Sequence, residues 1–196
     1  MDEEIEIINT ATRKEKIKNF IINNKKSIIT VIIILLLFLF SFFFYKDYQK
    51  RNSESLADKY NIAIIQYESG DKSKILDIMK NIIEQKDKTY SPLAFYYLLD
   101  NDLITSKEEI NKYFDILINE TKIDNENKNL ITFKKGLFNA EFANENELLS
   151  ILNPVIKSES IWKPHALYLM AEYYFAKNEK QKSKEFLEKL VSLENI

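Results

Sequence analysis

Residues 27–45 form an uninterrupted apolar run, SIITVIIILLLFLFSFFFY, that contains no charged side chain. As an α-helix this run would extend about 30 Å, the thickness of the hydrocarbon core of a bilayer. A buried core helix rarely needs so long a run. A cleaved signal peptide is the stronger rival, but the run is longer than the usual apolar region and no small-residue cleavage site follows it. We therefore predict an uncleaved transmembrane helix over residues 27–45.

The charges beside this run predict its orientation. Six basic residues precede it closely, and Glu15 is the one acid among them: Arg13, Lys14, Lys16, Lys18, Lys25 and Lys26. After the run, basic residues are diluted by acids: Lys46, Lys50 and Arg51 are accompanied by Asp47, Glu54 and Asp58. The flank richer in lysine and arginine stays in the cytoplasm. We expect a cytoplasmic N-terminus and an exported C-terminal domain over residues 46–196.

The leader, residues 1–26, has an acidic start followed by a basic stretch. Its apolar residues make two short stripes at helical spacing, compatible with an amphipathic helix: Ile5 and Ile8, then Ile17, Phe20 and Ile21. Two interpretations stay open. The leader is a solvated juxtamembrane segment whose lysines attract anionic headgroups, or it is a cytoplasmic docking element.

After residue 52 the pattern is that of helices. The chain has only two glycines and three prolines, too few for a β-sandwich or an enzyme rich in glycine loops. Apolar residues recur at helical spacing between short polar turns, and alternation at period two is absent. The sequence predicts an all-α domain.

The predicted helices share a repeating register. The apolar triplet Ile75, Met79 and Ile82 recurs after 35, 73 and 108 residues, as Ile110, Phe114 and Leu117; Leu148, Leu152 and Val155; and Ser183, Leu187 and Leu190. The helix before each triplet carries, at one equivalent position, Ala63, Leu98, Gly136 and Ala171. A small residue there lets two helices approach closely. This register predicts a solenoid of about four helix pairs, with another helical bundle as the alternative.

The last of these units resembles a tetratricopeptide repeat. Its first helix, Leu167-Tyr168-Leu169-Met170-Ala171-Glu172-Tyr173-Tyr174, has the large–small–aromatic order of such repeats. The earlier units depart from that order because Ile75, Ile110 and Leu148 stand where such repeats usually carry a small residue. We expect those three pairs to be splayed wider.

The whole architecture is similar to one bacterial family. The leader DEEIEIINTATRKEKIKNF, one membrane helix and an exported helical-repeat domain resemble the tetratricopeptide-like inner-membrane proteins related to the ancillary subunit of the Sec translocon. The resemblance implies an inner-membrane protein with a periplasmic domain. It also implies a place beside the translocon, where the protein works with periplasmic chaperones on emerging client proteins.

The residues that carry chemistry are sparse. The chain has no cysteine and one histidine, His165, so thiolate or histidine-rich metal sites and most nucleophilic triads are not expected. Neither glycine belongs to a phosphate-binding loop, and Glu108 and Glu109 follow Ser106 as first-turn acids. The near balance of 28 basic and 30 acidic residues gives no nucleic-acid footprint. We expect no enzyme activity, no cofactor and no nucleic-acid partner.

The remaining candidates are aromatic residues on or next to the predicted first helices: Tyr90, Tyr96, Tyr97, Trp162, Tyr168, Tyr173 and Tyr174. Core packing uses most such side chains, but a groove in a helical solenoid is lined by first helices, so some are expected to contact a partner. The predicted function is a membrane-anchored interaction scaffold accessory to the Sec translocon. A cell-envelope or division scaffold is the main alternative, and an anchored enzyme or cofactor carrier the weaker one.

Overall fold

The computed structural model describes residues 13–16, 18–68 and 74–193, and all regular elements within them are helical. The helices are α2 (Lys25–Glu68), α3 (Ile75–Glu84), α4 (Tyr90–Asp100), α5 (Lys107–Asp115), a π-helical turn η1 (Ile116–Glu120), α6 (Asn125–Asn139), α7 (Glu145–Ile156), α8 (Lys163–Ala176) and α9 (Lys180–Ser192). The predicted all-α class is confirmed.

The predicted membrane segment lies inside α2, which is 44 residues long. None of its apolar stretch is buried, and within the described residues α2 alone is long and apolar enough to cross a membrane. The helix does not end after Tyr45 but continues to Glu68. The chain divides into two compact units, 1–52 and 53–196, so the last part of α2 belongs to the second unit, where Leu56 and Ala63 are buried.

The described part of the leader, residues 13–16 and 18–23, is helical. Phe20 and Ile21 are exposed there. Ile5, Ile8 and Ile17 of the predicted stripes lie outside the described residues. The choice between the two interpretations of the leader stays open.

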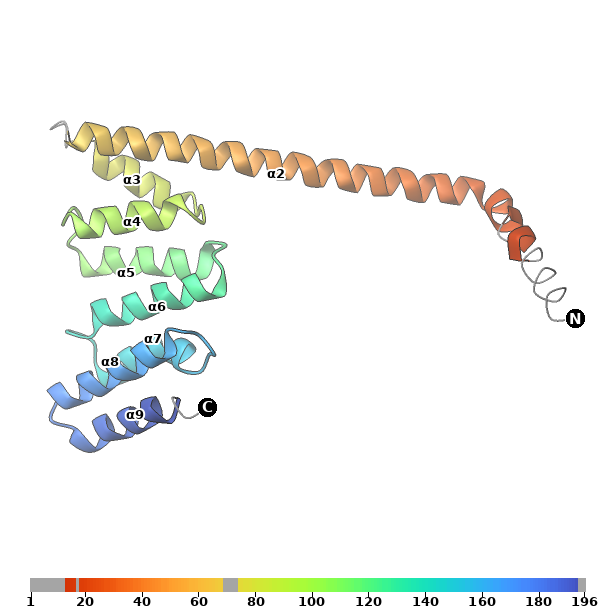
Figure 1. Cartoon of the computed structure of the whole chain (residues 1–196). Coiled ribbons are helices and arrows are strands. Elements are labelled where there is room, and N and C mark those ends of the chain that lie inside the picture. Colours follow the sequence, from red (N-terminus) through yellow and green to blue (C-terminus); the bar gives the residue numbers. More distant parts are fainter. Residues whose placement is uncertain (1–12, 17, 69–73, 194–196) are drawn as a thin grey trace, which may run out of the picture. The chain divides into compact units, whose positions relative to one another are not determined.

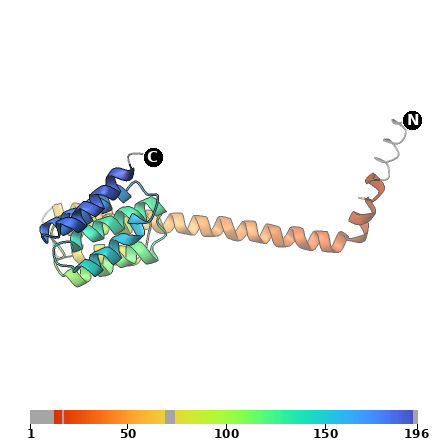
Figure 2. The ribbon, with the colours of Figure 1, turned by 90° about the horizontal axis from the view of Figure 1, so that it is seen from below.

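The second unit is a stack of helix pairs. As far as the structure describes it, there are four pairs: residues 53–68 of α2 with α3, α4 with α5 and η1, α6 with α7, and α8 with α9. The pairs follow one another in chain order down the stack (Figure 1). Seen from below, α9 lies in front and the helices overlie one another (Figure 2). The predicted number and order of pairs are confirmed.

The repeating register predicts which side chains are buried. All four first-helix positions are buried, from Ala63 to Ala171. The twelve second-helix positions are buried too, except that Leu190 is half-buried and Leu187 is exposed. The shared register therefore corresponds to a stack of structural repeats. The two positions that are not buried, Leu187 and Leu190, both lie in α9.

In the third and fourth pairs, helices with small residues at these positions approach each other closely. A Cβ on Gly136 would lie 2.3 Å from Cδ2 of Leu152, so α7 rests directly on the backbone of α6. The backbones of α8 and α9 approach over a longer stretch than those of any other two described helices, whereas α4 and α5 approach much less. This agrees with the expectation that the last pair, with Ser183 at the small position, is the tightest.

The interval of 38 residues between the second and third units has a local cause. Gly136 lies eleven residues after the first residue of α6, whereas Leu98 and Ala171 lie eight after the starts of α4 and α8. The additional residues form an extra N-terminal turn of α6. Its cap is Asp124, whose carboxylate accepts the N–H of Asn127.

Three of the described helix starts, those of α5, α6 and α7, have a side-chain cap. Ser106 and Asn144 accept the N–H of the residue three positions on, and Asn144 forms a capping box with Glu147. Pro164 lies in the first turn of α8. Ser91 precedes a proline but does not cap α4: its hydroxyl donates to the carbonyl of Ile82 at 2.7 Å, where it ties α4 to α3.

Candidate protein-interaction site

The fourth pair carries a cleft of about 280 Å³ on its first helix. We call it the α8 cleft, and it is lined by Phe133 and Leu137 from α6, Pro164, His165, Tyr168, Leu169 and Glu172 from α8, and Leu190 from α9. Two of its apolar side chains reach solvent: Leu137 is 56% exposed and Tyr168 is 50% exposed. A partly apolar cleft with half-exposed anchors is typical of a protein-binding surface.

One wall of the cleft is an aromatic cluster between α6 and α8. Phe133 stacks on Trp162 with ring centroids 6.0 Å apart, and the ring of His165 lies 5.8 Å from Phe133 and 5.2 Å from Trp162. Trp162 is half-buried at the start of α8 and His165 is exposed. His165 thus belongs to a packed aromatic wall, and within the described residues no group of three or more metal-ligating side chains exists. The wall holds Tyr168 on a rigid support.

A second aromatic cluster joins the first two pairs. Tyr60 contacts Tyr90 at 6.1 Å and Tyr97 at 6.3 Å, and Tyr67 contacts Tyr97 at 5.9 Å. All four rings are half-buried. Burial raises the pKa of the Tyr60 and Tyr97 phenols, so both stay protonated at neutral pH. Tyr90 and Tyr97 therefore connect α4 to α2 and leave only part of each ring for a partner.

Tyr96 lies on the side of α4 that meets α6. The ammonium group of Lys134 lies 3.9 Å from the centroid of the Tyr96 ring, a close cation–π contact. The phenol oxygen is buried with no hydrogen-bond partner among the described residues. Burial, with a smaller effect of Asp100, raises the pKa of this phenol. Tyr96 serves as a contact between helix pairs.

Tyr173 and Tyr174 are buried, so the structure places them in the core and not in a groove. The Tyr173 hydroxyl donates to the carbonyl of Ala143 at 3.1 Å. The Tyr174 hydroxyl donates to Oε1 of Glu145 at 2.9 Å, and Lys182 binds the same carboxylate at 2.8 Å. Burial and this hydrogen bond raise the pKa of Tyr174 to about 12. Both tyrosines hold the third and fourth pairs together.

The sequence analysis missed Phe133, Leu137 and His165 as members of the site. A signal for the aromatic wall was present, because Phe133 belongs to a series of aromatic residues at one register position: Tyr60, Phe95, Phe133 and Tyr168. Their spacing is that of the helix pairs. In the first pair Tyr60 contacts Tyr90 of α4, and in the third pair Phe133 contacts Trp162 at the start of α8. Within the described residues, no first helix follows for Tyr168 to contact.

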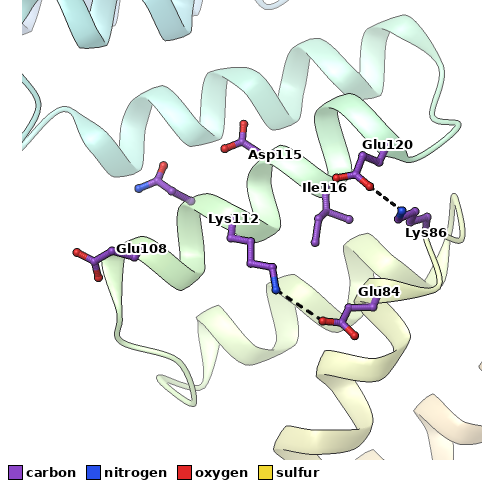
Figure 3. Close-up of a pocket in the computed structure, with 8 residues that line it drawn as sticks. Glu84, Lys86, Glu108, Lys112, Asp115, Ile116 and Glu120 are labelled. Atoms are coloured by element: carbon purple, nitrogen blue, oxygen red, sulfur yellow. Dashed lines mark ion pairs between the residues drawn. The ribbon is translucent and has the colours of Figure 1, made fainter.

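A larger, charged cleft of about 670 Å³ lies between the second helices of the first two pairs. Its opposite charges are joined across the gap: Nζ of Lys112 lies 3.7 Å from Glu84, and Lys86 binds Glu120 at 2.6 Å (Figure 3). Ser106 donates to Glu108 at 2.9 Å, and Lys135 binds Asp115 at 2.8 Å. Because its carboxylates are occupied by neighbours, we assign this cleft to the packing of the stack.

The comparison with protein families agrees with the helix pairs. Residues 18–111 match the family described as tetratricopeptide repeat-like domain. Over these residues the chain is similar to that family. The matched residues include the apolar stretch of α2 and end in α5, so the match stops before the α8 cleft. No curated protein and no solved structure matches the chain.

Proposed function

We propose that this protein is a membrane-anchored scaffold, in which α2 crosses the bilayer and the tetratricopeptide-like pairs bind a protein partner. The observation that carries the proposal is the α8 cleft, where Leu137 and Tyr168 expose half or more of their surface beside a packed aromatic wall. Exposed apolar side chains on a rigid support can bury area on binding without a large loss of conformational freedom. The apolar stretch of α2, none of which is buried, needs a lipid environment.

The tether contributes to function. A domain held at a membrane meets partners in the same membrane at a high effective concentration, so a contact of modest affinity is sufficient. The excess of basic residues before the apolar stretch favours a cytoplasmic N-terminus. Residues 46–196 would then lie on the periplasmic side of an inner membrane. The scaffold acts without catalysis of its own.

The finer proposal is that the partner belongs to the protein-export machinery. The similarity to the inner-membrane family related to the ancillary subunit of the Sec translocon supports this choice. The translocon, periplasmic chaperones and emerging client proteins would then be the neighbours of the helix pairs. A scaffold for envelope or division assembly is the competing assignment within the same functional class.

Site-specific photocrosslinking in intact membranes tests both the scaffold proposal and the choice of the export machinery as its partner. A photoreactive amino acid at position 168 should give protein adducts, and Leu137→Asp in the same chain should reduce them. The matched control is position 185, an exposed site on α9 outside the cleft lining. Equal adducts at both positions would refute the cleft. Division proteins without translocon subunits among the adducts would refute the finer proposal.

Topology needs a separate measurement. Protease added to spheroplasts should digest the helix pairs and leave the leader intact. Digestion only after the membrane is permeabilised would show that the domain faces the cytoplasm, contrary to the proposal.

A further inference from the structure

The last pair exposes side chains that the first pair covers. Leu187 of α9 is 40% exposed, whereas its equivalents Met79, Phe114 and Leu152 are at most 1% exposed. On the first helix of the pair, Tyr168 is 50% and Phe175 is 65% exposed. We call Tyr168, Phe175 and Leu187 the end face. It lies beside the α8 cleft and shares Tyr168 with it.

The first pair shows what covers these positions. Tyr60 and Tyr67 are the equivalents of Tyr168 and Phe175, and both rings contact Tyr97 of α4, the next first helix. α3, which carries Met79, also packs closely on α4. In the second pair, Phe114 contacts Phe138 of the following first helix at 6.1 Å. The stack therefore covers these positions with an α-helix that has an aromatic face.

No helix follows α9 within the described residues. A repeat stack normally ends in a unit whose outer surface is polar, because an apolar end is poorly compatible with water. The end face is not polar, because it exposes Tyr168, Phe175 and Leu187.

The charged residues beside the end face indicate which charge a helix covering it would carry on its flank. Lys180 and Lys184 lie on the same side of α9 as Leu187, at spacings of seven and three residues. Lys184 approaches Glu188 at 3.6 Å, but both side chains are largely exposed, so this pair is weak. Lys180 has no ion-pair partner in the part of the chain that the structure describes. On α9 this flank carries two lysines and one glutamate, whereas on α8 the exposed Glu172 lies between Tyr168 and Phe175. The α9 side therefore favours an acidic partner over the same side of a second copy.

We propose that the end face binds an amphipathic α-helix of a partner protein, stacked on α8 and α9 as α4 is stacked on the first pair, with aromatic residues on its apolar side and acidic residues on its flank. This inference rests on the proposed scaffold function and names the class of partner that the scaffold binds.

Peptide binding to the full chain in nanodiscs tests the proposal. The probe is a fluorescent peptide with the sequence of residues 90–100, which is the α4 helix, followed by a tail of three glutamates; a second probe carries three lysines instead. We expect the acidic probe to bind more tightly by fluorescence anisotropy. Leu187→Glu should weaken its binding about tenfold, because one buried leucine contact is lost and a charge is introduced. Lys180→Glu with Lys184→Glu should reverse the preference between the probes.

Leu93→Glu is the matched control, since it places the same charge at a leucine of α4 that is 44% exposed and lies outside both the α8 cleft and the end face. It should leave probe affinity within about twofold. Equal binding to wild type and Leu187→Glu, no binding of either probe, or equal binding of both probes would each refute the inference. So would self-association of the chain that Leu187→Glu abolishes, because a second copy would then be the occupant.

Photocrosslinking separates this inference from the scaffold proposal. Protein adducts from position 137 without adducts from position 187 would support the scaffold and refute the end face. Adducts from position 187 should map to an acidic amphipathic helix of the partner. Adducts there that map to an extended segment or to lipid would refute the proposed class of partner.

Discussion

In the third helix pair, Leu152 rests on the backbone of Gly136, whereas the equivalent positions of the second pair hold Leu98 and Phe114. The space between α4 and α5 is filled by rings, since Phe114 packs against Phe95 at 4.8 Å between centroids. All these side chains are fully buried, yet the third pair is close and the second is wide. The register therefore fixes which residues are buried, and the volumes of the facing side chains fix how far apart the helices lie.

The largest expected effects come from the central position of the second helices. Phe114→Ala should lower the free energy of unfolding by about 3–5 kcal/mol and Leu152→Ala by about 2–5 kcal/mol, because each leaves a cavity in a packed core. Leu187→Ala at the equivalent position of the last pair should cost less than about 1 kcal/mol, since that side chain is already partly in water. Urea unfolding of the full chain in detergent micelles, followed by circular dichroism, gives all three values. A cost for Leu187→Ala equal to the other two would show that it is a core residue.

Gly136→Ala tests the close approach directly. The added methyl group would overlap Cδ2 and Cγ of Leu152, at 2.3 and 2.8 Å from the new Cβ. Overpacking of this kind costs about 1–3 kcal/mol, and the better helix propensity of alanine returns up to about 1 kcal/mol. We expect a net loss of about 1–2 kcal/mol. In the Leu152→Ala background the same substitution should become neutral or favourable; an equal loss in both backgrounds would mean that Leu152 is not the obstacle.

The junction between the second and third pairs contains a reciprocal pair of amides. Asn111 and Asn139 exchange amide hydrogen bonds of 3.1 and 2.8 Å, and Lys135 binds Asp115 nearby. The junction of the first two pairs instead combines aromatic contacts, such as Tyr60 against Tyr97, with ion pairs. The two clusters of the hydrophobic core meet within α6.

Asn139→Ala tests what this pair of amides contributes. It removes both hydrogen bonds between the two side chains, while the Asn111 NH2 group keeps its bond to the Lys107 carbonyl. We expect a loss of about 1–2 kcal/mol. A double-mutant cycle with Asn111→Ala should give a coupling of about 0.5–1.5 kcal/mol. The matched control is Asn101→Ala, which removes an exposed amide that donates to the Tyr97 carbonyl and should be nearly neutral. A coupling near zero would show that these two hydrogen bonds stabilise the fold no more than hydrogen bonds to water would.

Much of this fold follows from residue spacing. An amphipathic helix fixes which side faces inward, so the positions of Ala63 through Leu190 could be assigned without coordinates. Helix separation, the extra turn of α6 and the π-helical turn at Ile116–Glu120 depend on contacts between elements, which spacing does not contain. Tyr173 and Tyr174 illustrate the same point for the site. They are consecutive, yet both are buried, because α8 is packed between α7 and α9.

The smallest effect concerns two carboxylates that occupy the first turns of α5 and α7. Glu109 is bound by Lys80 and the Tyr113 hydroxyl, and Glu145 by Lys182 and the Tyr174 hydroxyl. Hydrogen bonds from these lysines are the main cause that lowers the pKa of both carboxyls below the usual value. The second pair is thereby tied back to α3, and the third pair is tied forward to α8 and α9.

A carboxyl whose pKa is lower in the folded chain binds its proton more readily when unfolded. The stabilisation is therefore complete above about pH 5 and is lost as the pH falls through the folded-state pKa. Glu109→Gln and Glu145→Gln should each lower stability modestly at pH 7 and reduce the loss of stability between pH 7 and pH 3. Urea midpoints across that range provide the measurement, and Glu185→Gln, on an exposed carboxylate, is the control. If the stability of Glu145→Gln falls more steeply with decreasing pH than that of the wild type, the ion pair of Glu145 with Lys182 does not stabilise the folded state. If only Glu109→Gln reduces the loss of stability in acid, then only the contact between the second pair and α3 contributes. The third and fourth pairs are then held together by their apolar contacts.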